Sequence, residues 1–141
     1  MLTRISKEFR WEMGHRLPYH TEGCQNIHGH SYRMVVELIG ETDESGMVLD
    51  FGEISQIVRP ILAQLDHSFM VDPWDAMMQA VLRENNLKAT PVEFFSTAEN
   101  IAHWMLSQVR AGVQSPRIHE IAVQVFETVT SMAEARWTRE S

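Results

Sequence analysis

Two histidines and one cysteine near the N-terminus form the part of this sequence best suited to chemistry. His28 and His30 stand two residues apart, and Cys24, the only cysteine in the chain, lies four residues before His28. On a strand, side chains two residues apart share a face and start about 6 to 7 Å from each other. Two such imidazoles can converge on one ion at the zinc–nitrogen distance of about 2.0 to 2.1 Å. We therefore interpret this segment as a metal site with a thiol beside it.

A third histidine reaches the same place if two predicted strands pair. Apolar residues alternate with polar ones from residue 5 to His15 and again from His28 to residue 38, with the histidines on the apolar face of each run. As antiparallel neighbours, these strands bring His15 beside His28 and His30. Three histidines without a fourth protein ligand are typical of a catalytic zinc, which keeps one position open. The alternative is a hydrogen-bonded structural cluster, the usual role of a lone histidine on an apolar face.

The composition predicts one globular domain, residues 1–141, with neither a nucleic-acid nor a membrane partner. A net charge of −7 argues against a general nucleic-acid surface. No apolar run approaches the roughly 20 residues that a membrane span needs. The N-terminus lacks the apolar core of a signal peptide and one cysteine cannot form an internal disulfide, so we expect a cytoplasmic protein.

The remaining patterns predict helices that cover a sheet. A stripe from Ile54 to Leu65 predicts a helix capped by Asp50 and bent near Pro60. A shorter helix is expected from Asp72-Pro73 to Asn85-Asn86 and a third from residues 96 to 112. Extended segments are expected at residues 47–49, 92–95, 121–127 and 132–137.

A carboxylate–imidazole pair and two glutamates are the other candidate functional groups. Asp66 and His67 are adjacent at the end of the first predicted helix, where such a pair is usually a solvated cap. Glu99 lies three residues after Ser96, so a capping box explains it as well as a binding role does. Glu127 ends the apolar face of a predicted strand, where an unpaired buried carboxylate is costly. We therefore expect Glu127 to have a charged or multidentate donor partner, most plainly a ligand.

Six motifs are spread along nearly the whole chain: Phe9-x5-His15-Arg16-Leu17, Cys24-x3-His28-Gly29-His30, Val48-x-Asp50-Phe51, Leu65-Asp66-His67, Thr97-Ala98-Glu99-Asn100 and Glu127-Thr128. In kind and order they resemble those of the 6-pyruvoyl-tetrahydropterin synthase and 6-carboxytetrahydropterin synthase family. The resemblance implies an α+β tunnelling fold (T-fold): a four-stranded antiparallel sheet with two main helices on one face. It also implies a ring-forming homo-oligomer, typically a hexamer of two stacked trimers.

The same resemblance implies a role for each candidate residue. The three histidines would hold Zn²⁺, Cys24 would transfer protons as a thiolate, and Asp66 would orient His67 in a second proton relay on a neighbouring subunit's side of the site. A pterin is the implied small-molecule substrate. Its 2-amino and ring N–H donors would be bound by Glu127 with Glu99, and Thr97 would help at the same edge. The alternative for Cys24 is a small buried filler.

Within this family we favour the carboxy branch for a short chain with this cysteine-to-histidine spacing. The implied activity is that of a zinc-dependent 6-carboxy-5,6,7,8-tetrahydropterin synthase, a lyase that converts 7,8-dihydroneopterin triphosphate to 6-carboxytetrahydropterin with release of acetaldehyde and triphosphate. That reaction is a step toward deazapurine nucleosides such as queuosine. The pyruvoyl branch, which eliminates triphosphate, is the alternative. A non-catalytic metal- or pterin-binding T-fold protein would need neither Cys24 nor the Asp66-His67 pair.

Two stretches depart from the family pattern. Residues Phe69 to Phe95 replace a shorter loop after the Asp-His pair, and the tail from Met132 to Arg136 lacks the usual tyrosine. We expect these departures to change the substrate-side lid and not the metal site.

Overall fold

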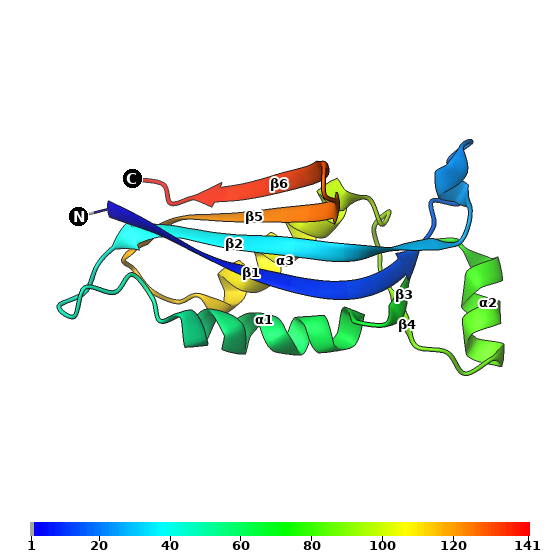
Figure 1. The fold of residues 1–141 in the computed structure, drawn as a ribbon, viewed down its shortest axis with the longest axis horizontal. Coiled ribbons are helices and arrows are strands. Elements are labelled where there is room, and N and C mark those ends of the chain that lie inside the picture. Colours follow the sequence, from blue (N-terminus) through cyan, green and yellow to red (C-terminus); the bar gives the residue numbers. More distant parts are fainter. Residues whose placement is uncertain (1) are drawn as a thin grey trace.

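The structure, a computed structural model, describes residues 2–141, and in them a single six-stranded sheet dominates (Figure 1). The strand order is β4-β3-β1-β2-β5-β6. The strands are β1 (Leu2–His15), β2 (His28–Glu41), β3 (Ser68–Val71), β4 (Ala89–Pro91), β5 (Ile118–Thr128) and β6 (Ser131–Thr138).

The two longest strands pair as the sequence predicts. β1 and β2 are antiparallel, with His15 opposite His28 and Met13 opposite His30. Burial alternates along both strands, so Trp11 and Tyr32 face the core while Glu12 and its neighbours across the pair face outward. The ends of β1 and β2 therefore bring all three histidines to one edge of the core face.

Two helices, α1 (Phe51–Leu65) and α3 (Ala98–Gly112), cover that core face (Figure 1). Each has one buried stripe, and both stripes join the same apolar cluster as the inward side chains of the long strands. The carboxylate of Asp50 caps α1 by accepting a hydrogen bond from the backbone of Gly52 at 2.7 Å. The helix continues through Pro60, and the predicted bend there stays a prediction.

The expectation of a four-stranded, purely antiparallel sheet was wrong. Two short strands extend the sheet beyond β1: β3 pairs with β1, β4 pairs with β3, and both pairings are parallel. Each is only three or four residues long, too short to show a two-residue period. The strand observed near the extended segment predicted at residues 92–95 is β4, which ends before it, at Pro91. The backbone N–H of Val92 still donates a hydrogen bond to the backbone carbonyl of Val71 at 3.1 Å.

The helix predicted from Asp72-Pro73 begins later, as α2 (Ala76–Glu84). Trp74 has φ +63°, a left-handed conformation that cannot start a right-handed helix, and Asp75 is the N-cap instead. The end at Asn85 is confirmed. α2 packs on a small separate cluster, away from the main core, formed by Phe69, Val71, Met78 and Leu82.

Residues 47–49 form no strand, contrary to expectation. The carboxylate of Asp43 accepts from the backbone of Ser45 at 2.9 Å and of Met47 at 3.0 Å, which closes the loop on itself. The backbone of this loop is thus satisfied locally instead of by a ladder. Among the helices of residues 2–141, none has the length and apolarity required to span a membrane.

Candidate metal centre

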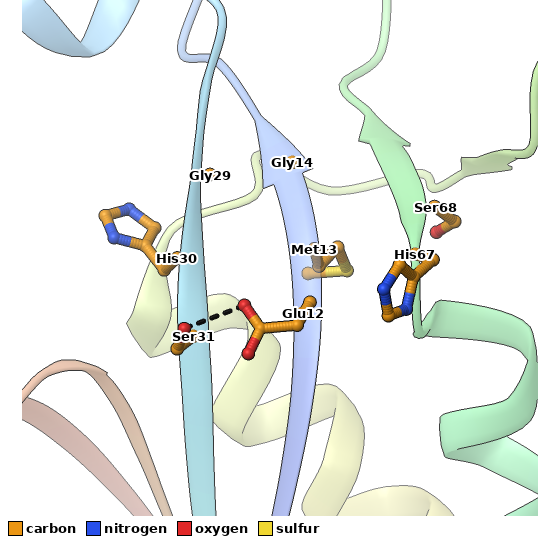
Figure 2. A pocket seen from close by; sticks show the side chains of 8 residues that line it. All are labelled: Glu12, Met13, Gly14, Gly29, His30, Ser31, His67 and Ser68. Carbon is orange, nitrogen blue, oxygen red and sulfur yellow. Dashed lines mark hydrogen bonds between the residues drawn. The ribbon is translucent and has the colours of Figure 1, made fainter.

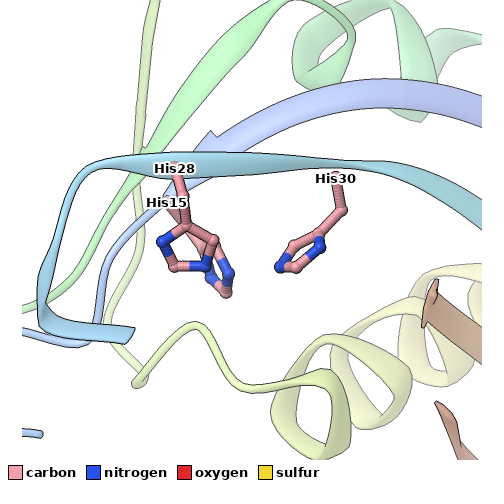
Figure 3. Close-up of side chains that lie close together, drawn as sticks. All are labelled: His15, His28 and His30. Carbon is pink, nitrogen blue, oxygen red and sulfur yellow. The ribbon is translucent and has the colours of Figure 1, made fainter. Parts of the chain in front are cut away.

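The three predicted histidines converge in space (Figure 3). Each of His15, His28 and His30 offers a ring nitrogen, and these nitrogens all lie within 4.8 Å of one another. The ring centroids are separated by 4.6 Å for the His15–His28 pair, by 5.2 Å for the His15–His30 pair and by 5.0 Å for the His28–His30 pair. Imidazoles at these separations can share one ion, which makes the group a candidate metal centre.

His15 is the most constrained of the three. It is only 2% exposed, and its Nδ1 lies 2.8 Å from the carbonyl oxygen of Ser96 and 3.1 Å from that residue's hydroxyl. If Nδ1–H donates to this carbonyl, Nε2 keeps its lone pair for a metal. Nε2 is buried and has no hydrogen-bond partner in the structure. An orphaned buried acceptor that faces two other imidazoles fits a ligand of a metal ion.

Burial also favours the neutral form of these rings. Desolvation, followed by repulsion from His28, lowers the pKa of His15 from 6.5 to about 4. The same two causes lower the pKa of His30. The Nδ1 of His28 lies 2.8 Å from the carbonyl of Asn26, so this ring too can be held in one tautomer. Metal binding requires neutral imidazoles, and burial favours that form for His15 and His30.

Glu127 lies directly beside the cluster. β5 pairs with β2 up to Phe126, so the next residue lies near the end of the strand, beside the histidines. Its Oε1 is 3.9 Å from Nε2 of His15, and its Oε2 is 3.8 Å from Nε2 of His30. Burial, with a smaller contribution from Glu99, raises the pKa of Glu127, and His28 opposes that rise. Glu127 has no local partner in its sequence neighbourhood, whereas the structure places it against His15 and His30.

Cys24 stands apart from this cluster. It lies in the short 3₁₀ helix η1 (Gly23–Gln25) within the loop that joins β1 to β2, and its side chain is exposed. This loop projects beyond the ends of the two strands (Figure 1). The backbone carbonyl of Cys24 accepts a hydrogen bond from Leu17 at 2.7 Å. An exposed position excludes the alternative of a buried filler.

Asp66 and His67 lie on the outward face of the sheet. Nδ1 of His67 is 2.9 Å from the carboxylate of Asp66, whose other oxygen accepts from the backbone of Glu12 at 2.8 Å. His67 lines an open groove of about 410 Å³ with Glu12 and Ser31 (Figure 2). Glu12 and Ser31 face away from the core, whereas the imidazole of His30 turns to the other side of β2. A single chain therefore separates the Asp66–His67 pair from the three histidines.

Comparison with known proteins places this arrangement in a family. The family model described as 6-pyruvoyl tetrahydropterin synthase matches residues 4–138. The chain belongs to the 6-pyruvoyl tetrahydropterin synthase family. The match covers every candidate residue described above.

Members of the 6-pyruvoyl tetrahydropterin synthase family with curated names include two bacterial relatives. A protein of Haemophilus influenzae named 6-carboxy-5,6,7,8-tetrahydropterin synthase is 35% identical over 139 residues, which cover 93% of this chain and 96% of the relative. A protein of the same name from Aquifex aeolicus is 31% identical over 158 residues, which cover 95% of this chain and 98% of the relative. The fold matches a crystal structure of 6-pyruvoyl tetrahydropterin synthase from Plasmodium vivax with a TM-score of 0.80 at 18% identity, over 99% of both chains.

The N-terminus of α3 differs in detail from the capping box that the sequence predicts. Thr97, not Ser96, is the N-cap, and its hydroxyl accepts from the backbone of Asn100 at 3.2 Å. Ser96 is instead fully buried against His15. Glu99 is exposed in the first turn of α3 and close enough to Glu127 to act on its pKa. Sequence reasoning missed the contact of Ser96 because a serine before a helix is the usual signal of a cap.

Proposed function

We propose that the chain is a zinc-dependent 6-carboxy-5,6,7,8-tetrahydropterin synthase. It converts 7,8-dihydroneopterin triphosphate to 6-carboxytetrahydropterin and releases acetaldehyde and triphosphate, in the cytoplasm and on the route to queuosine. One observation carries the proposal: three imidazoles and a carboxylate meet at one edge of the core, with a buried nitrogen of His15 left without a partner. The curated names of the two bacterial relatives favour the carboxy product.

The histidines would be the residues that hold the metal. His15, His28 and His30 supply nitrogen ligands that suit zinc, and the set of three leaves room for substrate oxygens. When bound, the ion would polarise the side-chain oxygens of the substrate and acidify the neighbouring C–H and O–H bonds. The chain's own contribution is to keep His15 neutral by burial and to orient its ring through Ser96.

Glu127 would recognise the pterin ring. Its two carboxylate oxygens match the adjacent 2-amino and ring N–H donors of a pterin, and Glu99 and Thr97 lie at the start of α3 on the same side. The side chain of Glu127 is 25% exposed, so a ligand can reach it. A ligand bound here would have its reacting side chain next to the three imidazoles.

Proton transfer would fall to Cys24 and to the Asp66–His67 pair. Cys24 is exposed on the loop that joins β1 to β2, so its thiolate would be accessible to a bound substrate. The carboxylate of Asp66 holds the Nδ1 side of His67 at 2.9 Å and so orients the ring. Since His67 lies on the outward face, it would serve the site of a neighbouring subunit, within a homo-oligomer that we propose to be a hexamer.

The test is identification of the products formed from 7,8-dihydroneopterin triphosphate. Mass spectrometry after incubation with metal-loaded protein should find 6-carboxytetrahydropterin, with acetaldehyde trapped as a hydrazone. A 6-pyruvoyl product without acetaldehyde would assign the pyruvoyl branch instead. Unchanged substrate, with pterin still bound, would show a non-catalytic binding protein.

A further inference from the structure

A buried carboxylate connects the candidate metal centre with the loop that carries Cys24. Asp72, between β3 and α2, is only 1% exposed, and both of its oxygens accept hydrogen bonds. One accepts from the backbone N–H of Ser96 at 3.1 Å, and the other from the hydroxyl of Tyr19 at 2.9 Å. No Lys, Arg or His of residues 2–141 forms an ion pair with this carboxylate. A buried charge held by two neutral donors is costly, and so points to a role beyond packing.

The hydrogen bond from Ser96 connects Asp72 with a proposed metal ligand, His15. Ser96 is fully buried, and its carbonyl and hydroxyl are the two partners of Nδ1 of His15. The position of this backbone segment therefore decides where the ring of His15 points. Since Asp72 holds the N–H of the same residue, it sets the orientation of that segment. Partners one step behind a metal ligand typically change metal affinity by about 10- to 100-fold when they are removed.

The hydrogen bond from the hydroxyl of Tyr19 connects Asp72 with the loop that carries Cys24. Tyr19 belongs to the β1–β2 loop, where Leu17 donates to the carbonyl of Cys24 at 2.7 Å and His20 donates to the carbonyl of Leu17 at 3.0 Å. These two short bonds join the position of Tyr19 to that of Cys24. Anchoring of the Tyr19 hydroxyl by Asp72 thus holds the loop against the edge of the sheet.

We propose that Asp72 is a positioning residue that orients His15 through Ser96 and holds the Cys24 loop through Tyr19. This inference rests on the proposed metal centre and gives the long stretch between Phe69 and Phe95 a function. That stretch carries the one carboxylate that contacts both parts of the site. The role concerns geometry only, and Asp72 itself touches neither metal nor substrate.

Four variants separate this role from general stability. Asp72→Ala removes both bonds, whereas Asp72→Asn keeps an acceptor for Ser96 and can still pair with Tyr19. Tyr19→Phe removes only the bond to the loop. Leu82→Ala is the matched control, because it creates a cavity in the small cluster under α2 without touching either contact.

The measurements are zinc affinity, by competition with a chromophoric chelator, and hydrogen exchange of loop residues 16–27, both without substrate. Asp72→Ala should bind zinc about 10- to 100-fold more weakly and exchange faster in the loop. Asp72→Asn should stay within about 3-fold of wild type in affinity, since it retains an acceptor for the backbone N–H of Ser96, which contacts the ligand. Tyr19→Phe should keep its zinc affinity but exchange about 10-fold faster, as expected for loss of one hydrogen bond to a charged group.

Two results would overturn the proposal. The first is a zinc affinity that is unchanged in Asp72→Ala, or one that falls equally in Leu82→Ala. Either outcome would mean that Asp72 contributes only to general stability. The other is unchanged loop exchange in Tyr19→Phe, a mild variant that carries the test if Asp72→Ala does not fold. Because neither readout uses a pterin, failure of the proposed reaction would leave these results standing, whereas absence of zinc binding in wild type would remove both proposals.

Discussion

The two faces of the sheet at the ends of β1 and β2 carry opposite kinds of polar site. On the core face, the imidazole of His15 is buried with a free Nε2, and Glu127 approaches two histidines without a hydrogen bond to either. On the outward face, Ser31 donates to Glu12 at 2.7 Å, and the side chain of His67 is 76% exposed. The first group lacks partners that a ligand could provide, whereas the second is already paired with neighbouring residues.

This difference shows how strand alternation distributes chemistry. Neighbouring residues on a strand face opposite ways, so His30 and Ser31 belong to different sites although they are adjacent in sequence. The core face can desolvate its groups, which lowers the pKa of His15 to about 4. On the outward face, the backbone N–H of Glu12 is the main cause that lowers the pKa of Asp66, with His67 the next. Only the core face offers an unpaired cluster that a metal would complete.

The largest effect that separates catalysis from metal binding is expected for Cys24→Ala. As a proton carrier outside the cluster, Cys24 should be needed for turnover and not for zinc. We expect turnover of 7,8-dihydroneopterin triphosphate to fall about 100- to 10,000-fold, the usual contribution of a general acid or base. Zinc content, measured by elemental analysis, should stay at the wild-type level. Loss of zinc in this variant would instead make Cys24 a fourth ligand and the site a structural one.

A somewhat smaller effect is expected for Glu127→Gln, which probes the carboxylate of the core face. The change replaces an acceptor oxygen with an NH₂ donor directed at a ligand donor, so a charge-assisted pair is lost and a clash is added. We expect pterin affinity to fall about 30- to 1,000-fold, corresponding to roughly 2 to 4 kcal/mol. Calorimetric titration with a pterin gives the affinity.

Zinc content and circular dichroism are the controls for Glu127→Gln. Both should match wild type. Because Glu127 lies within 3.9 Å of His15, a loss of zinc would show that its carboxylate supports the metal and not the pterin. Unchanged pterin affinity would leave Glu127 as a structural carboxylate.

The smallest effect, a partial recovery of turnover, is expected when two inactive variants are mixed, His28→Ala and His67→Ala. If the outward face of one subunit serves the core face of the next, hybrids can combine an intact core face with an intact outward face. An equimolar mixture, unfolded and refolded together, should recover about a quarter of wild-type turnover, the fraction of contacts that join two intact halves. Light scattering should find an oligomer. A monomer, or a mixture as inactive as its parents, would contradict a shared site.

The sequence was sufficient for the parts of the fold that follow a long period. Fourteen-residue strands alternate for long enough to assign their buried face, and with antiparallel pairing that alternation placed His15 beside His28 and His30. The apolar stripes of the helices α1 and α3 could be assigned from the sequence as clearly as the strands. The three-histidine cluster was therefore predictable, because it needs only two neighbouring strands and their pairing direction.

The parts that sequence could not supply depend on contacts between distant segments. Asp72 preceded a proline and resembled a helix start, yet it is a buried acceptor for Tyr19 and Ser96, which are 53 and 24 residues away along the chain. Similarly, β3 and β4 are too short for a pattern and exist because they pair beside β1. No local spacing predicts such contacts, since they arise from tertiary packing.

The zinc content of the purified protein tests the central claim, that the core face and not the outward face is the metal centre. Elemental analysis should find about one zinc per chain in wild type and in His67→Ala. In His28→Ala, zinc should be lost, because removal of one of three ligands leaves two imidazoles to hold the ion. Full zinc in His28→Ala, or loss of zinc in His67→Ala alone, would contradict the assignment.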